Sequence, residues 1–388
     1  MTPSEVRAAA QELVRLHDRF APLFGRQEAR AQSLVYLRGL LGAEGRKSAE
    51  PMALVFGYPP AGEVSQLQVL ALQRFLTYSP WEAQDLHREI QAVFAEELVP
   101  STARWSLGTV GVIDGSGFVK KGTESVGVQR QYCGRLGKQE NCQVGVFLVG
   151  VTPDGCALLD DQLYLPRAWA KDKERRAKVY VPKKLRFRTE PQLGVDLLRR
   201  TRGAGKVRFD WVIADERYGQ NGTFLDGLDE LGQRYVVEVP VNITVWTEDP
   251  AACVPPYSGQ GRPPTRAHRD AVRSVQAIAA DLPAEAWQTL QLRDGATGPL
   301  VFQFAAVRVW AVRHRRPGPP IWLVMRRSWT ASPSIRQRSA TRPTARTWSG
   351  PSTEPPARTP PGTTATTTRP TTSTRGPRRR STSRCCAS

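Results

Sequence analysis

The segment VGVIDGSGFVKKG (residues 110–122) places a carboxylate directly after a hydrophobic run. Val110, Val112 and Ile113 are apolar and β-branched, which predicts a buried strand. We expect Asp114 to end this strand and the Gly-Ser-Gly that follows to turn the chain. An acid at this point, with two lysines after it, is one way to place a metal ligand opposite an anionic substrate. An ordinary turn acid at a strand end is the alternative.

A second buried strand, RFDWVIAD (residues 208–215), also ends in an acid, Asp215. Between the two, the continuous apolar run NCQVGVFLVGVT (residues 141–152) predicts a central strand. Helical patterns alternate with these strands, which predicts an α/β or α+β domain. If the two acidic strand ends are neighbours, Asp114 and Asp215 can together hold one or two divalent cations.

The composition points to a basic protein with a sizeable core. The 388 residues are 40% hydrophobic and carry a net charge of +19. Such a charge favours a polyanionic partner, above all nucleic acid, whereas the high arginine content of proteins from GC-rich genomes is the alternative. The six cysteines include no CxxC pair, which argues against a zinc site. We find no apolar run of membrane-spanning length and no signal peptide, and we therefore expect a cytoplasmic location.

The chain divides into five segments. Residues 1–105 have helical periodicity, and Ser79, Pro80 and Glu82 together predict a capping box at a helix start. Residues 106–245 contain the acidic strands. The remaining three segments are a Pro-, Gly- and Arg-rich insertion, resumed strands and a C-terminal tail, at residues 246–300, 301–328 and 329–388.

The tail differs from everything before it. Residues 329–388 hold 11 Arg, 15 Thr and a single acid, Glu354. A segment this poor in apolar residues buries too little area to offset its ordering entropy, so we expect disorder. The change is abrupt after Ser328, which indicates a shifted reading frame; a genuine basic DNA-binding tail is the competing explanation.

Several blocks of the sequence, in the same order, resemble bacterial insertion-sequence transposases with the DDE superfamily endonuclease domain. The resemblance runs from about Tyr36 to Arg327. It is carried by residues 110–148, LYLPRAWAKDKERR, FRTEPQLGVDLL, WVIADERYGQN and RYVVEVP.

The resemblance implies an α/β fold with an RNase H-like mixed sheet and flanking helices, preceded by a helical N-terminal region. It implies that Asp114 and Asp215 are the first two catalytic carboxylates and ligate Mg²⁺ or Mn²⁺ in a two-ion site. The N-terminal helices would then bind DNA. The implied partner is double-stranded DNA at element ends and targets, with self-association and a nucleoid-associated location in a bacterial cytoplasm.

The family's third carboxylate, a Glu on a helix after the IWLVMRR strand, has no counterpart in this chain. Glu354 is the only acid beyond that strand, and Pro355 and Pro356 directly after it oppose a helix. We therefore expect a transposase copy that is inactive. A non-catalytic DNA-binding remnant and an unrelated RNase H-fold nuclease are the alternatives. Lys120 and Lys121 either contact phosphates or are simply solvated.

Overall fold

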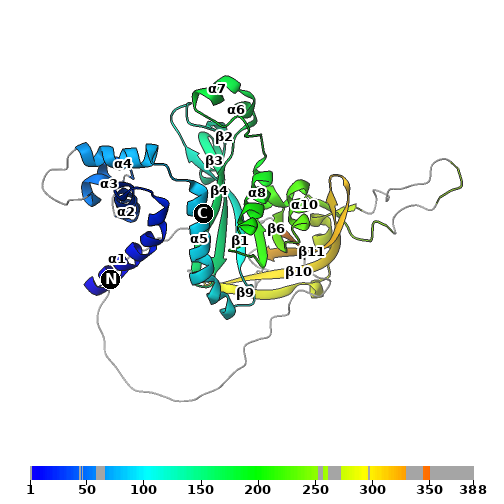
Figure 1. The fold of residues 1–388 in the computed structure, drawn as a ribbon. Helices are drawn as coiled ribbons and strands as arrows, with labels where there is room; N and C mark the ends of the chain where they lie inside the picture. The colour runs from blue at the N-terminus through cyan, green and yellow to red at the C-terminus, as the bar shows by residue number, and fades with distance from the viewer. Residues whose placement is uncertain are drawn as a thin grey trace, which may run out of the picture.

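The structure is a computed structural model that describes residues 2–42, 45, 47–57, 66–251, 257–260, 272–295, 298–328 and 344–349. A group of helices at the N-terminus lies beside a large sheet, and further helices cover one face of that sheet (Figure 1). Among the described residues, none of the helices combines the length and the apolar character needed to cross a membrane.

The N-terminal region is helical, as its periodicity predicts. A capping box between Thr2 and Glu5 starts the first helix. The helices pack on a core of their own that includes Phe20, Met52 and Leu72. The elements are α1 (Pro3–Phe20), α2 (Gln27–Leu41), α3 (Ala49–Phe56), α4 (Gln66–Tyr78), α5 (Ala83–Val93), and the short turns Phe94–Leu98 and Val99–Arg104.

The capping box predicted at Ser79 does not form. Helix α5 begins at Ala83, and its N-cap, Glu82, makes no side-chain capping bond. Trp81 packs instead among aromatic rings of the helical core, 6.2 Å from the ring of Phe24 between centroids. Burial of this large ring outweighs the local capping preference and keeps the preceding residues outside the helix.

The first half of the sheet is RNase H-like and confirms the expected fold class. Strand β3 pairs antiparallel with β1, and β1, β5 and β6 are parallel neighbours in that order. Strands β2 and β4 both pair with β3. The bounds are β1 (Val110–Val119), β2 (Gln129–Cys133), β3 (Lys138–Thr152), β4 (Gly155–Leu163), β5 (Trp211–Ala214) and β6 (Tyr235–Val239).

Strand β1 does not stop at Asp114, as the sequence had suggested. It continues to Val119, and Gly115, Ser116 and Gly117 pair in register with residues 144–146 of β3. The pairing of β1 with β5, in contrast, ends at Ile113. Pairing with β3 therefore keeps Gly115, Ser116 and Gly117 in strand conformation, although β5 no longer pairs with β1 at these residues.

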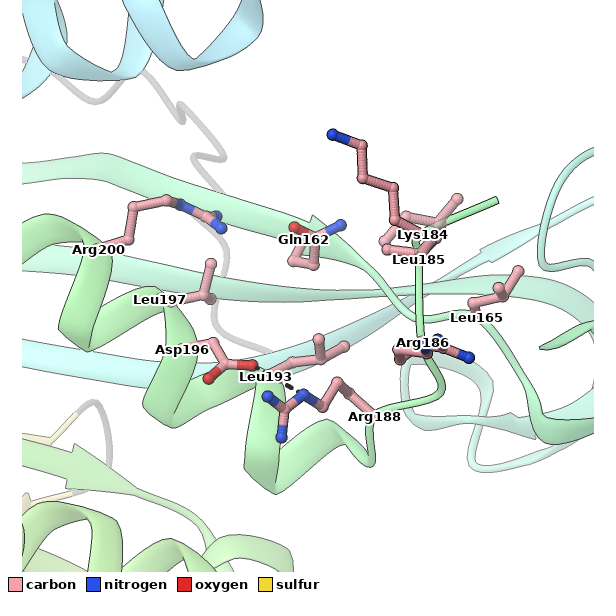
Figure 2. Close-up of a pocket in the computed structure, with 11 residues that line it drawn as sticks. Gln162, Leu165, Lys184, Leu185, Arg186, Arg188, Leu193, Asp196, Leu197 and Arg200 are labelled. Carbon is pink, nitrogen blue, oxygen red and sulfur yellow. Dashed lines mark ion pairs between the residues drawn. The ribbon is translucent and has the colours of Figure 1, made fainter. Parts of the chain in front are cut away.

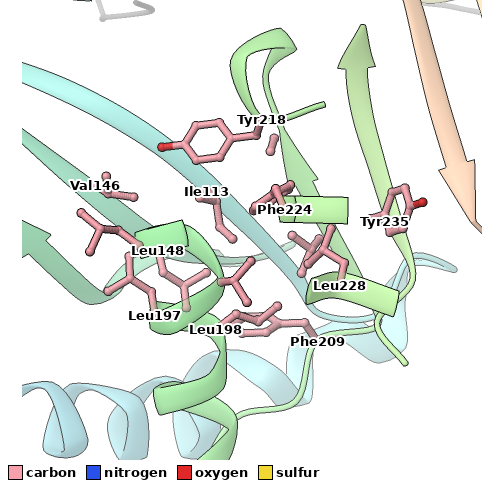
Figure 3. Close-up of a cluster of buried hydrophobic side chains, with 14 of the residues drawn as sticks. Ile113, Val146, Leu148, Leu197, Leu198, Phe209, Tyr218, Phe224, Leu228 and Tyr235 are labelled. Carbon is pink, nitrogen blue, oxygen red and sulfur yellow. The ribbon is translucent and has the colours of Figure 1, made fainter. Parts of the chain in front are cut away.

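Helices connect and cover these strands. Thr189 and Gln192 form a capping box at the start of α8, whose apolar side packs on β1, β3 and β4. Figure 3 shows Leu197 and Leu198 of this helix against Ile113 and Leu148 of the sheet. The helices of this half are α6 (Arg167–Lys171), α7 (Lys173–Lys178), α8 (Glu190–Gly203), α9 (Glu216–Gly219) and α10 (Gly222–Glu230).

A buried ionic cluster joins α5 to this half. Asp160, 1% exposed in its side chain, pairs with Arg200 of α8 at 2.8 Å. His87 of α5 lies 3.1 Å from Asp160 and 2.9 Å from Asp161. The carboxylates of Asp160 and then of Asp161 raise the pKa of His87 to about 9. The protonated ring therefore links the helical region to the sheet.

The second half of the sheet has a separate core, centred on Val309 and Leu323. Strands β10 and β11 form its long hairpin, and the sheet order continues from β6 through β12, β11 and β10 to β7 and β8. The elements are β7 (Thr244–Trp246), β8 (Val272–Ser274), α11 (Val275–Asp281), β9 (Gln288–Gly295), β10 (Gly298–Arg313), β11 (Arg316–Ser328) and β12 (Thr344–Ser349).

Strand β12 differs from the disorder expected for the tail. Its six residues pair antiparallel with β6 on one side and with β11 on the other. Backbone hydrogen bonding needs no particular side chain, so a sequence without a hydrophobic pattern still fills the position. The rest of residues 329–388, including Glu354, lies outside the described residues.

Candidate active site

Asp114 and Asp215 follow the last paired residues of two adjacent parallel strands. Ile113 of β1 and Ala214 of β5 are partners in the register, and each aspartate comes directly afterwards. Adjacent strands lie about 4.8 Å apart, so the two side chains leave the sheet as neighbours. Both line one pocket of about 410 Å³. The structure thus brings the two predicted site residues together.

Each aspartate is held by backbone amides. The Gly115 N–H donates to Oδ1 of Asp114 at 2.7 Å. Asp215 is the N-cap of α9, and its Oδ1 accepts from the N–H groups of Arg217 and Tyr218 at 3.0 and 3.4 Å. These bonds use Oδ1 of each carboxylate and fix its direction.

The pocket brings two negative charges together, and both aspartates remain exposed to solvent. Burial raises the pKa of Asp114 above its usual range, the Gly115 amide opposes this, and the charge of Asp215 adds to it. Two neighbouring carboxylates favour a nearby cation, because a cation relieves their repulsion.

A third carboxylate lies at this site, from Glu190 at the start of α8. Its Oε2 is 2.6 Å from Nη1 of Arg217, and its side chain is 15% exposed. Burial raises the pKa of Glu190, Arg217 opposes this, and the charges of Asp215 and Asp114 add to it. The carboxylate of Glu190 therefore belongs to the same electrostatic site as the two aspartates.

Two glycines let α8 come close to β1. A Cβ on Gly194 would lie 3.0 Å from Cγ2 of Ile113, and a Cβ on Gly115 would lie 3.0 Å from Oε2 of Glu190. Glu190 and Gly194 are one helical turn apart and therefore share a face of α8. The missing side chains thus allow the Glu190 carboxylate to reach the backbone of β1 beside Asp114.

Tyr218 adds an unusual polar group to the pocket. The residue is fully buried, and its hydroxyl has no hydrogen-bond partner in the part of the chain that the structure describes. Burial and then the charge of Glu190 raise its pKa. Figure 3 shows the ring beside Phe224, with the hydroxyl pointing away from that aliphatic and aromatic cluster.

The donor set fits a divalent cation in part. Asp114 and Asp215 supply the hard oxygen ligands that Mg²⁺ and Mn²⁺ prefer. The unpartnered Tyr218 hydroxyl lies in the same pocket and can bond a water or an oxygen ligand. Within the described ranges, no group of three or more His, Cys, Asp or Glu side chains is arranged to hold a metal ion.

Lys120 and Lys121 do not lie beside the aspartates. Lys120 is six residues after Asp114 and directly follows β1, about 20 Å further along the strand direction. The backbone oxygen of Lys120 accepts a hydrogen bond from the Asn141 side chain at 2.7 Å. The two lysines are thus placed at the far end of the β1–β3 ribbon.

A basic groove lies along α8 and the loop that precedes it. Figure 2 shows Lys184, Arg186 and Arg188, which precede α8, around a pocket of about 290 Å³ with Arg200 at its far side. Arg188 pairs with Asp196 at 3.5 Å, whereas Lys184 and Arg186 are exposed. This loop leads the chain directly into the helix that carries Glu190.

Sequence reasoning missed Glu190, Arg217 and Tyr218. An acid in the first turn of a helix ordinarily serves the helix dipole, so Glu190 gave no separate signal. Arg217 and Tyr218 stand two and three residues after Asp215, where one helical turn returns them to the site. Glu190 comes close to Arg217 and Tyr218 only because α8 packs on β1.

The sequence of this chain matches a known protein family. Residues 19–299 match the family described as DDE superfamily endonuclease. A "Probable transposase for insertion sequence element IS701" from Microchaete diplosiphon is 31% identical over 172 residues, which are 44% of this chain and 40% of that protein. The chain thus spans about two fifths of the length of this curated relative.

Proposed function

Because the chain belongs to the DDE superfamily endonuclease family, we propose that it is a DDE-type transposase of an insertion sequence. An intact transposase of this type would cleave the element's ends and join them to target DNA with a divalent cation. The adjacent positions of Asp114 and Asp215, at neighbouring strand ends in one pocket, are the observation that carries the proposal. The transposase relative supports it.

Asp114 and Asp215 would hold Mg²⁺ or Mn²⁺, which activates water and stabilises the leaving oxygen in phosphodiester cleavage. The chain's own residues fix the geometry. Amides of β1 and α9 orient the two carboxylates. Tyr218 offers a donor toward an oxygen in the pocket.

DNA binding is supported by the distribution of basic residues. The exposed Lys184 and Arg186 lie on the approach to α8, and Lys120 and Lys121 lie at the end of the β1–β3 ribbon. Phosphate contacts of this kind position a duplex without reading its sequence. The N-terminal helices would then recognise the element's end, and two copies would pair when both ends are held.

We propose that this copy does not transpose. The family's third carboxylate has no counterpart after β11 in the printed sequence, where a Thr-, Arg- and Pro-rich segment stands instead. Two aspartates alone supply too few ligands and too little negative charge for in-line phosphoryl transfer. The second candidate function, binding of element ends without chemistry, follows from the same absence together with the basic groove.

A plasmid-cleavage assay tests the proposal. One supercoiled plasmid carries the DNA that flanks the coding sequence on both sides, and a matched plasmid carries unrelated DNA. We expect the given chain to bind the first plasmid and to nick neither above the level of Asp114→Ala. A chain with the reading frame restored after Ser328 should cut the first plasmid with Mg²⁺. Efficient nicking by the given chain would refute its inactivity, and failure of the restored chain would refute the transposase assignment.

A further inference from the structure

We propose that Tyr132 and Arg135, at the turn between β2 and β3, form a site for an unpaired nucleotide of a DNA strand beside Asp114 and Asp215. In this site Arg135 binds a backbone phosphate, and the ring of Tyr132 stacks on an unpaired base. The inference rests on the proposed function, because it takes DNA as the substrate of this pocket. The two residues position the strand and take no part in the chemistry.

The turn after β2 lies against β1 a few residues beyond Asp114. The thiol of Cys133, the last residue of β2, donates to the backbone oxygen of Gly117 at 3.7 Å. A Cβ on Gly117 would lie 2.7 Å from the Cys133 sulfur, so glycine leaves room for this contact. The Gly137 N–H closes the turn on the backbone oxygen of Cys133 at 3.0 Å. Packing and backbone hydrogen bonds therefore hold this turn in place.

The pocket of about 410 Å³ lies between this turn and the two aspartates. Its lining includes Tyr132 and Arg135 as well as Asp114 and Asp215. Strand β5, which leads to Asp215, pairs with one edge of β1, whereas β3, which pairs with β2, lies on the other edge. Asp215 and the Tyr132–Arg135 pair therefore come from opposite sides of β1. A pocket of this size is within the usual range for small ligands, about 300–1,000 Å³, and can take one nucleotide.

Arg135 supplies positive charge to the pocket. In the part of the chain that the structure describes, its exposed side chain forms no hydrogen bond or ion pair. The other arginine of the lining, Arg217, is paired with Glu190 at 2.6 Å. An anion that enters the pocket therefore meets a guanidinium at Arg135 that no carboxylate already occupies. Phosphate is an anion whose geometry matches the planar set of arginine donors.

Tyr132 offers an aromatic surface at the same turn. The residue is 50% exposed, and its ring makes no hydrogen bond or ring contact within the described ranges. An exposed ring together with a basic group is how many proteins bind single-stranded nucleic acid without reading its sequence. Within a duplex, neighbouring bases cover both faces of each base. The site should therefore prefer a single-stranded extension or a melted segment to intact duplex.

The measurement is fluorescence anisotropy of the full-length chain with two labelled duplexes, one blunt and one with a short single-stranded extension of adenines. A chelator is present, so that cleavage does not enter the readout. The unaltered chain should bind the extended duplex more tightly by about fivefold or more, the factor expected from one base–aromatic stack. Tyr132→Thr should remove this preference and leave binding of the blunt duplex unchanged, since Thr keeps the strand propensity and lacks the ring. Tyr132→Phe should retain the preference, because the ring and not the hydroxyl stacks.

A second variant tests the phosphate contact. Arg135→Gln should weaken binding of the extended duplex by about threefold or more, through loss of a charge-assisted hydrogen bond to phosphate. The matched control is Arg293→Gln, which removes the same charge from the exposed strand β9 in the other half of the sheet. If Tyr132→Thr does not fold, Arg135→Gln decides by this comparison, because Arg135 is an exposed turn residue.

Loss of the preference in Tyr132→Thr, with Tyr132→Phe and Arg293→Gln unchanged, supports the proposal. It is overturned if the unaltered chain shows no preference, if Tyr132→Thr keeps it or weakens both duplexes equally, if Tyr132→Phe loses it, or if Arg135→Gln has no larger effect than Arg293→Gln.

Cleavage separates this inference from the proposed function. A frame-restored chain that cuts element ends, although Tyr132 confers no preference, would refute only the nucleotide site. A preference that depends on Tyr132, in a chain whose restored form leaves the ends uncut, would refute only the transposase assignment.

Discussion

The carboxylate of Glu190 and the guanidinium of Arg217 form an ion pair at 2.6 Å, although 27 residues separate them in the sequence. Glu190 starts the helix that crosses β1, and Arg217 lies in the first turn after Asp215. The pair therefore links the start of α8 to α9, the short helix whose N-cap is Asp215. The positive charge of Arg217 offsets part of the repulsion among the nearby carboxylates.

Replacement of Gly194 by alanine should destabilise the fold by about 1–3 kcal/mol, the usual cost of overpacking a core. A Cβ there would meet Ile113 at 3.0 Å and Tyr218 at 3.2 Å. Chemical denaturation of the two proteins measures the difference. Gly203→Ala is the matched control on the same helix, because a Cβ there meets nothing within 4 Å. Equal stabilities of the two variants would show that the close packing of α8 is unimportant.

Stability should decrease between about pH 6.5 and pH 9 because of His87. The carboxylates of Asp160 and Asp161 raise the pKa of His87 to about 9 in the folded protein. The folded value lies above the unfolded value of about 6.5, so the contribution is complete below that pH and disappears as the pH rises through about 9. We expect a change of about 1–3 kcal/mol in the free energy of unfolding.

His87→Gln should remove most of this pH dependence, as measured by urea denaturation at pH 6.5 and pH 9.5. Burial lowers the pKa of His17, so its titration acts below pH 6.5 and leaves this window unaffected. A His87→Gln protein with an unchanged pH profile would assign the effect to other groups.

Removal of two positive charges from the basic groove should lower the salt dependence of DNA binding. Lys184→Gln combined with Arg186→Gln should reduce the slope of log K against log salt by roughly 2, because each phosphate contact contributes about 0.9. The control, Lys206→Gln with Arg208→Gln, removes the same two residue types with the same spacing from an exposed loop beyond the other end of α8. Fluorescence anisotropy with a labelled duplex at several salt concentrations gives both slopes, and equal slopes would exclude this groove as a contact.

Much of the fold could be predicted because the local signals and the tertiary structure agree. The continuous apolar run at residues 141–152 lies within β3, a central strand that pairs on both edges as predicted. The Ser79 prediction was wrong because Trp81 is needed in the helical core. The turn after Asp114 was wrong because an antiparallel partner, far along the chain, holds the glycines in a strand.

The site was predictable only in part. Asp114 and Asp215 each have a local signal, an acid after a β-branched run, and parallel pairing of β1 with β5 then brings them together. Glu190 has no such signal, because its role depends on how closely α8 approaches β1. That distance is set by Gly194 and Gly115, and a glycine in a sequence does not reveal which atom fills the space beside it.

Strand β12 bears on how truncations of this protein are to be understood. It lies between β6 and β11, and its removal would leave two unpaired strand edges facing a gap one strand wide. Such a gap accepts any extended segment that offers its backbone, including one from a second molecule. A chain shortened before β12 should therefore exchange strands and self-associate. The measured DNA binding of such a shortened chain would then reflect a new oligomer as well as the loss of basic charge.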